Sequence, residues 1–374
     1  MRVAFDASTA AFRQKTGTGV YCDELIRAYQ SRFSNDQVIH TYRLSRRVRG
    51  KSFLLPVPAN ASREILIDPW TYFKGGNYDI FHGLNSRLPL LTRSKMVATV
   101  HDLFSIFGEF SDAQFREDQA HKLKQMIARA DHVIVPATFT RDELVNRIGV
   151  HSSKVTVVPE GVRQLFLNNS KKQDSFARVQ EHFKIKNPYL LFVGTLEKRK
   201  NVVGLIKTFV DLNRHYPEKM DLVLVGHPGF QYEEIKKEIE KSEIDSQIKI
   251  LGFVGEVSLA ELYQACEAFV FLSLEEGFGI PVIEAMACGV PVMTSNTTSL
   301  PEVGKGYSWL VDPHNHEEAA MTLAKILKKE PSTVERIKAG QAFARTQTWS
   351  MVAEKTREVY VRVLGTKSPS FQSS

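Results

Sequence analysis

Two glutamates, Glu276 and Glu284, flank the segment GFGIPVI, which follows an apolar run at 269–272. The run predicts a β-strand, and Pro281 suits the first turn of a short helix that Gly289 would end. The glycines let backbone N–H groups at the helix start approach a phosphate closely. Carboxylates are poor partners for phosphate but accept hydrogen bonds from pairs of sugar hydroxyls. The segment therefore predicts a site for a ligand that carries phosphate and sugar; the alternative is that the glutamates only complement a helix N-terminus.

A second loop is expected to bring positive charge to the edge of the sheet where the glycine segment after residue 272 lies. The buried strand expected at 189–194 is followed by Thr195 and then by the basic residues Arg199 and Lys200. In an open parallel sheet, the loops after the strands line one crevice at the carboxyl ends. A guanidinium fork and a compact ammonium suit a diphosphate, so we expect this loop to bind one; a solvated turn is the alternative.

The first part of the chain carries a glycine pair, Gly17 and Gly19, between a predicted strand at 1–7 and a predicted helix. The pair is not a dinucleotide-binding motif, because Cys22 stands where the third glycine belongs and no acidic residue ends the run at 38–44. A simple strand-to-helix turn is the other interpretation of these glycines.

His101 and Asp102 directly follow a predicted strand at 95–100. Side chains at this position project into the ligand crevice of a parallel sheet, and Asp102 is expected either to orient His101 or to act as a local cap. A zinc site built from His82, His101 and His121 is not favoured, because their spacing lacks the tight pattern of zinc ligands.

Alternating strand and helix patterns predict an α/β protein with two domains. The boundary is expected in the polar stretch at 168–174, which gives domains at 1–168 and 169–349. A final amphipathic helix is expected at 350–365 and a disordered tail at 366–374.

The composition limits the class of protein. The 374 residues are 43% hydrophobic and 24% charged, as in globular proteins. No run of about 18 apolar residues predicts a membrane span. The start of the chain is expected to be a strand and not a signal peptide, which predicts a cytoplasmic location. Three cysteines, Cys22, Cys266 and Cys288, have no metal-binding or disulfide pattern and are expected to be free thiols.

The net charge of +7 fits an anionic substrate, an anionic membrane surface or nucleic acid, and does not choose among them. A basic cluster contributes to this net charge. The cluster is either a solvated face of the protein or a contact with anionic lipid head groups. The cluster consists of Arg43, Arg46, Arg47, Arg49 and Lys51.

The string from Glu276 to Pro291 resembles the E-x7-E signature of family 4 of the retaining glycosyltransferases, which have the GT-B fold. The resemblance implies two Rossmann-like parallel-sheet domains that face a cleft. The first would take the acceptor and the second the nucleotide sugar, and the last helix would cross back to the first domain. The residues that match the signature are Glu276, Gly277, Phe278, Gly279, Pro281, Glu284, Ala285, Gly289 and Pro291.

By this resemblance, Glu276 and the following backbone amides hold the donor sugar, and Glu284 binds the nucleotide ribose. Arg199 and Lys200 match a diphosphate loop, although many relatives have Arg where this chain has Thr195. The implied catalytic residues are Arg199, Lys200, Glu276 and His101. The implied donor-binding residues also include Gly17, Gly19, Gly194, Val254, Gly277, Phe278, Gly279, Ile280 and Glu284, with Asp102 and Thr195 behind them.

The resemblance implies transfer of a hexose from a nucleotide diphosphate donor, with retention at the anomeric carbon, to a saccharide or lipid-linked acceptor. GDP-mannose is the expected donor and envelope polysaccharide synthesis the expected setting, because the loop GTLE-x-RKN occurs in mannosyl- and rhamnosyltransferase-like relatives. No DxD string is present, so neither a metal ion nor a cofactor is expected. A nucleic acid partner is not expected, whereas peripheral contact with the inner face of a membrane is. Two alternatives stay open: a non-catalytic nucleotide-sugar binding protein and a nucleotide-sugar epimerase of GT-B architecture.

Overall fold

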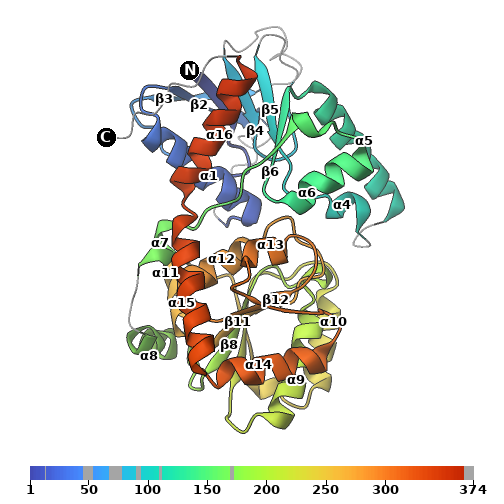
Figure 1. Ribbon diagram of the computed structural model, residues 1–374, viewed down its shortest axis with the longest axis vertical. Coiled ribbons are helices and arrows are strands. Elements are labelled where there is room, and N and C mark those ends of the chain that lie inside the picture. The colour runs from blue at the N-terminus through green and yellow to red at the C-terminus, as the bar shows by residue number, and fades with distance from the viewer. Residues whose placement is uncertain are drawn as a thin grey trace. The chain divides into compact units, whose positions relative to one another are not determined.

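The computed structural model describes residues 1–12, 14–44, 54–66, 78–89, 94–108, 112–168 and 172–365. They form two compact units, each built around one parallel sheet (Figure 1). The first unit combines Met1–Gly161 with Thr348–Ser374, and the second is Val162–Gln347. The predicted α/β class with two parallel-sheet domains is confirmed. The sequence predicts domain boundaries after residue 168 and after residue 349.

The first sheet is parallel, with the strand order β3-β2-β1-β4-β5-β6-β7. Successive side chains of β1 enter different cores: Val3 and Phe5 lie in one, and Ala4 lies in the other. Such alternation, with apolar residues on both faces, suits a parallel sheet that helices cover on both sides. The strands are β1 (Arg2–Asp6), β2 (Gln37–Arg43), β3 (Ala61–Leu66), β4 (Ile80–Gly83), β5 (Lys95–Thr99), β6 (His132–Val135) and β7 (Val155–Val157).

Two helices that are distant in sequence pack together in the first unit (Figure 1). They are α1 (Gly17–Arg32) and α16 (Trp349–Val363), and both contribute to the core that contains Val3 and Phe5. The Tyr360 hydroxyl of α16 lies 2.6 Å from Nδ1 of His82 on β4. The predicted return of the last helix to the first domain is confirmed. The described residues of this unit also form the α-helices α4 (Phe104–Phe107), α5 (Ala113–Arg129) and α6 (Thr138–Glu143).

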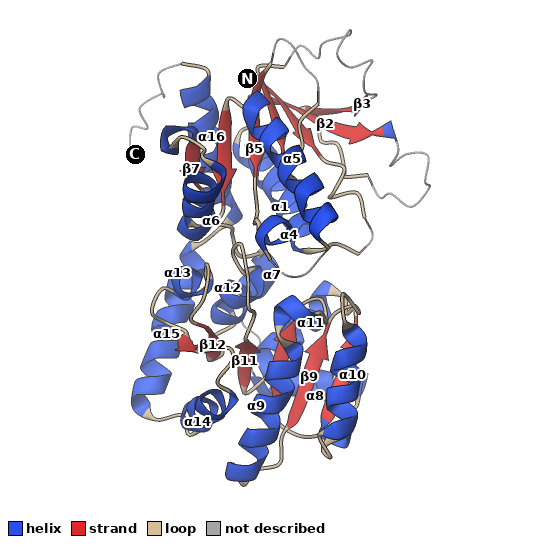
Figure 2. Ribbon diagram, turned by 90° about the vertical axis from the view of Figure 1, so that its right-hand side faces the viewer, coloured by secondary structure: helices blue, strands red, loops and turns tan. Residues whose placement is uncertain are grey.

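The second sheet is also parallel and has the strand order β10-β9-β8-β11-β12-β13. Its strands β9, β11 and β12 are labelled in Figure 2. Because β8 and β11 are neighbours, the loops that follow them emerge side by side at one edge. The strands are β8 (Tyr189–Val193), β9 (Asp221–Val225), β10 (Ile248–Gly252), β11 (Ala268–Phe271), β12 (Val292–Ser295) and β13 (Trp309–Val311).

The helix expected after the glycine loop is α12 (Ile280–Ala287), with Pro281 in its first turn. Gly279 precedes it with φ of +102° and Gly289 follows it with φ of +74°, conformations that favour glycine. The predicted stop at Gly289 is confirmed. The other helices of this unit are α7 (Gln164–Leu167), α8 (Lys172–Phe183), α9 (Val202–His215), α10 (Tyr232–Lys241), α11 (Glu256–Ala265), α13 (Leu300–Gly304), α14 (His316–Leu327) and α15 (Pro331–Thr346).

The start of α6 has no side-chain cap. The helix begins at Thr138, and its N-cap residue is Ala137. The backbone of Ala137 has the extended conformation of a cap position, with φ of −142°, so the helix start is set by chain geometry and not by a hydroxyl.

Some expected features fall partly or wholly outside the described residues. Arg43, the first residue of the basic cluster, pairs with Asp6 at 3.3 Å. Arg46, Arg47, Arg49 and Lys51 lie outside the described residues, as does the tail at 366–374. The three cysteines are free thiols, as expected. In the described part of the chain, no helix combines the length and the apolar character needed to cross a membrane.

Candidate functional site

Close packing shapes the loop after β8. The Gly194 N–H donates to the carbonyl of Val225 at 2.9 Å. A Cβ atom on Gly226 would lie 1.8 Å from the Gly194 carbonyl oxygen, so only glycine allows the loops after β8 and β9 to come this close. The loop then forms a short turn, Lys198–Lys200, and the Arg199 carbonyl accepts a hydrogen bond from Leu274, after β11, at 2.9 Å. This bond fastens the basic turn to the loop that carries Glu276.

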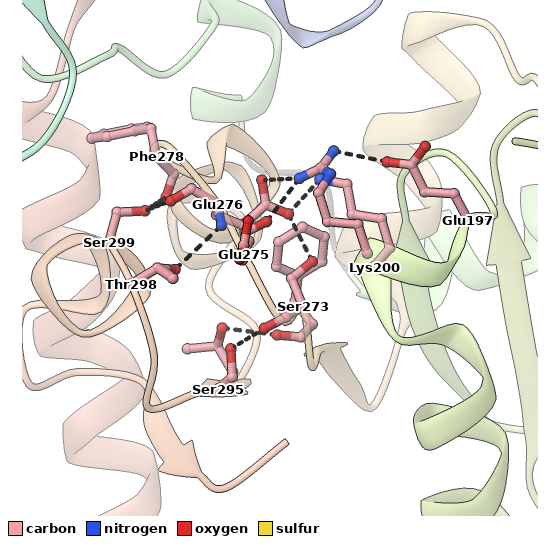
Figure 3. A network of polar contacts seen from close by, with 12 residues as sticks. Glu197, Lys200, Ser273, Glu275, Glu276, Phe278, Ser295, Thr298 and Ser299 are labelled. Carbon is pink, nitrogen blue, oxygen red and sulfur yellow. Dashed lines mark hydrogen bonds and ion pairs between the residues drawn. The ribbon is translucent and has the colours of Figure 1, made fainter. Parts of the chain in front are cut away.

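Glu276 is the centre of a buried ion cluster (Figure 3). The ammonium of Lys200 pairs with Oε1 of Glu276, and Nη1 of Arg199 lies 3.3 Å from Oε2. The Ser273 hydroxyl donates to Oε1 at 2.7 Å. The Glu276 side chain is only 8% exposed, so these contacts take the place of water around the carboxylate. The structure thus brings together three of the four predicted catalytic residues.

Two more acceptors hold Arg199 in this cluster. Its guanidinium donates to Oε1 of Glu197 and to the carbonyl of Glu275, both at 2.8 Å. Sequence reasoning did not single out Glu197 or Ser273. A carboxylate two residues before Arg199 in the same turn was the available signal for Glu197, whereas a serine near a glutamate is too common to indicate a contact.

Burial and charge oppose each other at both ends of the central ion pair. Burial and the neighbouring Arg199 disfavour the ammonium of Lys200 and outweigh the attraction of Glu276, so the pKa of Lys200 lies below its ordinary value. Burial also opposes ionisation of Glu276, but the charges of Lys200 and Arg199 outweigh it and hold the pKa of Glu276 below its ordinary value. Glu276 is therefore an ionised acceptor at neutral pH, which suits sugar hydroxyls.

Residues after β12 brace the glycine loop (Figure 3). The Ser299 hydroxyl lies 2.9 Å from the carbonyl oxygen of Glu276 and 3.2 Å from that of Phe278, and the Glu276 N–H donates to Thr298 Oγ1 at 3.2 Å. These bonds fix the backbone just before α12. The predicted donor-binding residues Gly277, Phe278, Gly279 and Ile280 follow one another at this helix start.

Glu284 belongs to a second buried ion pair, on α12. Its carboxylate oxygen Oε1 accepts a hydrogen bond from Nε of Arg163 at 2.8 Å, and Nη1 of Arg163 lies 3.0 Å from Glu256. Sequence analysis missed Arg163. Its only signal was a charged residue among apolar ones just after a turn, which does not identify a partner far along the chain.

Three further predicted residues lie at the same edge of the second sheet. Gly194 and Thr195 follow β8, and Val254 follows β10 and is buried. The Leu196 N–H donates to the carbonyl of His227 at 2.8 Å, which joins the loop after β8 to the loop after β9. The positions are those expected, and the roles in donor binding stay predictions.

The glycine pair lies at the start of α1 in the first unit. Gly17 is the first residue of the helix. A Cβ atom on Gly19 would lie 3.2 Å from the Thr9 carbonyl oxygen, so the chain packs closely here, whereas Gly17 has open space around it. Close packing therefore favours glycine at position 19 and places no such demand on position 17.

His101 follows β5 and is engaged at both ring nitrogens. Nε2 donates to the carbonyl of Leu84 at 2.9 Å, and Nδ1 lies 3.3 Å from the carboxylate of Glu160. Burial disfavours the imidazolium, but the Glu160 carboxylate, the Leu84 carbonyl and Asp102 outweigh it, so the pKa of His101 is raised. Asp102 was predicted either to orient His101 or to act as a local cap. The carboxylate placed against Nδ1 of His101 is that of Glu160, which sequence analysis missed.

The charged groups of the second unit can hold an anionic ligand. Arg199 and Lys200 supply a guanidinium fork and an ammonium next to a helix start, a combination that binds phosphate groups. Among the described residues, no group of three or more His, Cys, Asp or Glu side chains is arranged to hold a metal ion.

Two family models match most of the chain, namely Glycosyltransferase Family 4 over residues 16–163 and Glycosyl transferases group 1 over residues 173–343. O-antigen chain mannosyltransferase B of Escherichia coli is 28% identical over 283 residues, which is 75% of this chain and 74% of that protein. Serotype-specific mannosyltransferase WbdA of Escherichia coli is also 28% identical, over 72% of this chain and 34% of its own length. The chain thus spans about a third of this second relative.

Solved structures with the same fold extend the comparison. Sucrose-phosphate synthase from Thermosynechococcus elongatus superposes with a TM-score of 0.75 at 18% identity, covering 98% of this chain and 99% of that one. Anabaena HepE in complex with UDP gives a TM-score of 0.75 at 17% identity, covering 97% and 100%. At these identities the likeness shows the fold, which is GT-B. The two family models, which together cover most of the chain, show that it belongs to family 4 of the retaining glycosyltransferases.

Proposed function

We propose that this glycosyltransferase moves mannose from GDP-mannose to a saccharide or lipid-linked acceptor during envelope polysaccharide synthesis. The observation that carries the proposal is the buried cluster in which Arg199 and Lys200 meet Glu276 beside the start of α12. Two cations and the amides of a helix start fit a diphosphate, and an ionised carboxylate fits the hydroxyls of a hexose. One site thus provides for both halves of a nucleotide-sugar donor.

The chemical difficulty in retaining transfer is the charge that develops on the departing diphosphate. Arg199, Lys200 and the backbone amides before α12 are the groups that stabilise that charge. One well-placed donor in such a site is worth about 3 kcal/mol of transition-state stabilisation. The acceptor hydroxyl attacks the anomeric carbon on the face that the diphosphate leaves, and its proton departs with a phosphate oxygen.

Donor binding rearranges the cluster. The diphosphate competes with Glu276 for the ammonium of Lys200, while the sugar hydroxyls compete with Lys200 for the carboxylate of Glu276. Both exchanges must occur together, because a buried charge that loses its partner is strongly destabilised. We therefore expect Lys200 to turn to the phosphates when Glu276 turns to the sugar.

The names of the relatives, and not the geometry of the site, support the identity of the sugar and of the nucleotide base. Relatives at 26% to 28% identity carry the name mannosyltransferase, and two of the names refer to the O-antigen chain. In contrast, Anabaena HepE has been solved in complex with UDP-glucose. GDP-mannose is the donor that the relatives in sequence support. The cytoplasmic location and the contact with the inner face of a membrane stay predictions.

A donor panel tests the proposal. UDP-, GDP-, ADP- and dTDP-sugars are compared by thermal shift and by release of nucleotide, all in EDTA. GDP-mannose is expected to raise the unfolding temperature and to be hydrolysed slowly or transferred. Stabilisation by another donor alone would contradict the mannose assignment, and isomerisation of the donor sugar would identify an epimerase. Binding without any turnover in the presence of acceptor saccharides would point to a non-catalytic binding protein.

A further inference from the structure

Arg163 lies next to Glu284, whose carboxylate is predicted to bind the ribose, and it has two acidic partners. Its side chain is 10% exposed, and that of Glu284 is 2% exposed, whereas Glu256 is 61% exposed. The Arg163–Glu284 bond of 2.8 Å is therefore a buried ion pair, and Glu256 offers a solvated second contact at 3.0 Å.

Several elements restrict the Arg163 guanidinium. Arg163 is the N-cap residue of α7, which packs against both α11 and α12. The guanidinium carbon lies 4.6 Å from the centre of the Phe166 ring. Glu256 opens α11, and Glu284 lies on α12, so the fork bridges two helices. A planar group with a ring on one side and carboxylates on two helices has little freedom to rotate.

Stability alone is a weak reason for this arrangement. A buried ion pair is often no more stabilising than apolar side chains of the same volume. A guanidinium provides direction, because its rigid fork fixes the plane of the carboxylate that it binds. Burial disfavours the charge on Arg163, but Glu284 and Glu256 outweigh it and raise the pKa of Arg163. Arg163 therefore stays charged beside Glu284.

We propose that Arg163 is a positioning residue of the donor site, which holds the Glu284 carboxylate oriented for the ribose hydroxyls of the nucleotide. This inference rests on the proposed function, because it requires Glu284 to bind ribose. Arg163 acts through Glu284 and not on the reacting atoms. Its loss should thus weaken recognition of the ribose and leave the chemical step largely intact.

The test is the ratio of affinities for GDP and 2′-deoxy-GDP, measured by calorimetry on the full chain. Wild-type protein should prefer GDP, because Glu284 accepts hydrogen bonds from the ribose hydroxyls. Arg163→Lys keeps the charge but loses the fork. It should bind GDP about 10- to 100-fold more weakly, the size of effect seen when a contact group is misplaced, and should lose most of the preference over 2′-deoxy-GDP. The KM for GDP-mannose should rise while kcat changes little.

Three variants separate positioning from general destabilisation. Arg178→Lys is the matched control, because Arg178 pairs with Glu261 on α11 in the same unit and should leave the ratio unchanged. In a Glu284→Gln background, Arg163→Lys should weaken GDP binding no further, because its effect passes through Glu284. Glu256→Gln removes the exposed anchor of the fork with little risk to folding, and it should produce a smaller loss of the same ratio.

The outcomes are distinguishable. A folded Arg163→Lys variant with the wild-type ratio would overturn the inference and leave the proposed function standing. If Arg163→Lys does not fold, an unchanged ratio in Glu256→Gln counts against the inference in the same way. Should the wild type bind UDP in place of GDP, the pair becomes UDP and 2′-deoxy-UDP. A wild-type protein that binds none of ADP, GDP and UDP would overturn the proposed function itself.

Discussion

Two glutamates of the second unit, Glu276 and Glu267, each pair with two cationic side chains, but of the two only Glu276 belongs to the candidate site. Glu276 bridges Arg199 and Lys200, and Glu267 bridges two lysines on other elements. We expect Glu276→Gln to lower kcat/KM by about 100-fold or more, the loss seen when a transition-state contact is removed. Glu267→Gln should lower the unfolding free energy and leave kcat/KM within a few-fold of wild type. Steady-state kinetics with parallel urea unfolding measures both, and equal losses of activity in the two variants would contradict the site assignment.

The His101–Glu160 contact predicts how the stability of the first unit depends on pH. Because the folded state raises the pKa of His101, its contribution is fully present below the unfolded value of about 6.5 and is lost as pH rises through the folded pKa. The difference in unfolding free energy between wild type and His101→Gln should therefore be largest near about pH 5 and decline toward about pH 9. Denaturant unfolding across this range measures it, with His121→Gln, an exposed histidine on α5, as the control. A difference that grows with pH would show that Glu160 does not hold the imidazolium.

Sequence reasoning found the residues that lie in a compact motif and missed their partners. Glu276 and Lys200 could be predicted because glycine loops and basic turns after parallel strands have a recognisable order. Arg163, Glu160 and Ser273 could not, since nothing local indicates which distant side chain a buried charge or hydroxyl will meet.

At the scale of elements, two glycines that precede helices provide a comparison. Gly279 precedes α12 with φ of +102°, and a Cβ atom there would lie 2.9 Å from Cδ2 of Leu300. Gly255 precedes α11 with φ of −67° and has open space around it. Gly279→Ala should cost about 1–3 kcal/mol of stability and also disturb the amides before α12, whereas Gly255→Ala should cost less than about 1 kcal/mol and leave those amides in place. Chemical unfolding and donor affinity check both, and equal effects of the two substitutions would contradict the role of the Gly279 conformation.

Strands and helices with a strong apolar pattern were predicted well, and polar ones were not. The buried strand β8 and the helix α12 follow from their own sequences. In contrast, β3 carries the sequence ASREIL and is mostly half-buried, so it lacks the alternation of a core strand. The polar stretch proposed as the domain boundary runs into α8, whose buried residues are only Ser175 and Val179. Such elements owe their structure to neighbours, which a local pattern does not reveal.

At the scale of the whole molecule, the first unit depends on the far end of the chain. Val352 of α16 is fully buried in the core shared with α1, whereas Val363 of the same helix is half-buried. Val352→Ala should lower the unfolding free energy by about 2 kcal/mol, and Val363→Ala by less than about 1 kcal/mol, because a cavity forms only where the surroundings are packed. Urea unfolding followed by tryptophan fluorescence measures both, since Trp349 lies in this core. Equal small losses would mean that α16 is only loosely attached.

The division of the first unit between Met1–Gly161 and Thr348–Ser374 has a consequence during synthesis. A ribosome delivers the whole of the second unit before it delivers the helix that completes the first. The second unit can therefore fold while the nascent first unit still exposes the apolar face of α1, and proteins are most prone to aggregate in such intermediates. A protein built in this order finishes its earliest-made half last, because the core of that half closes only after α16 has left the ribosome.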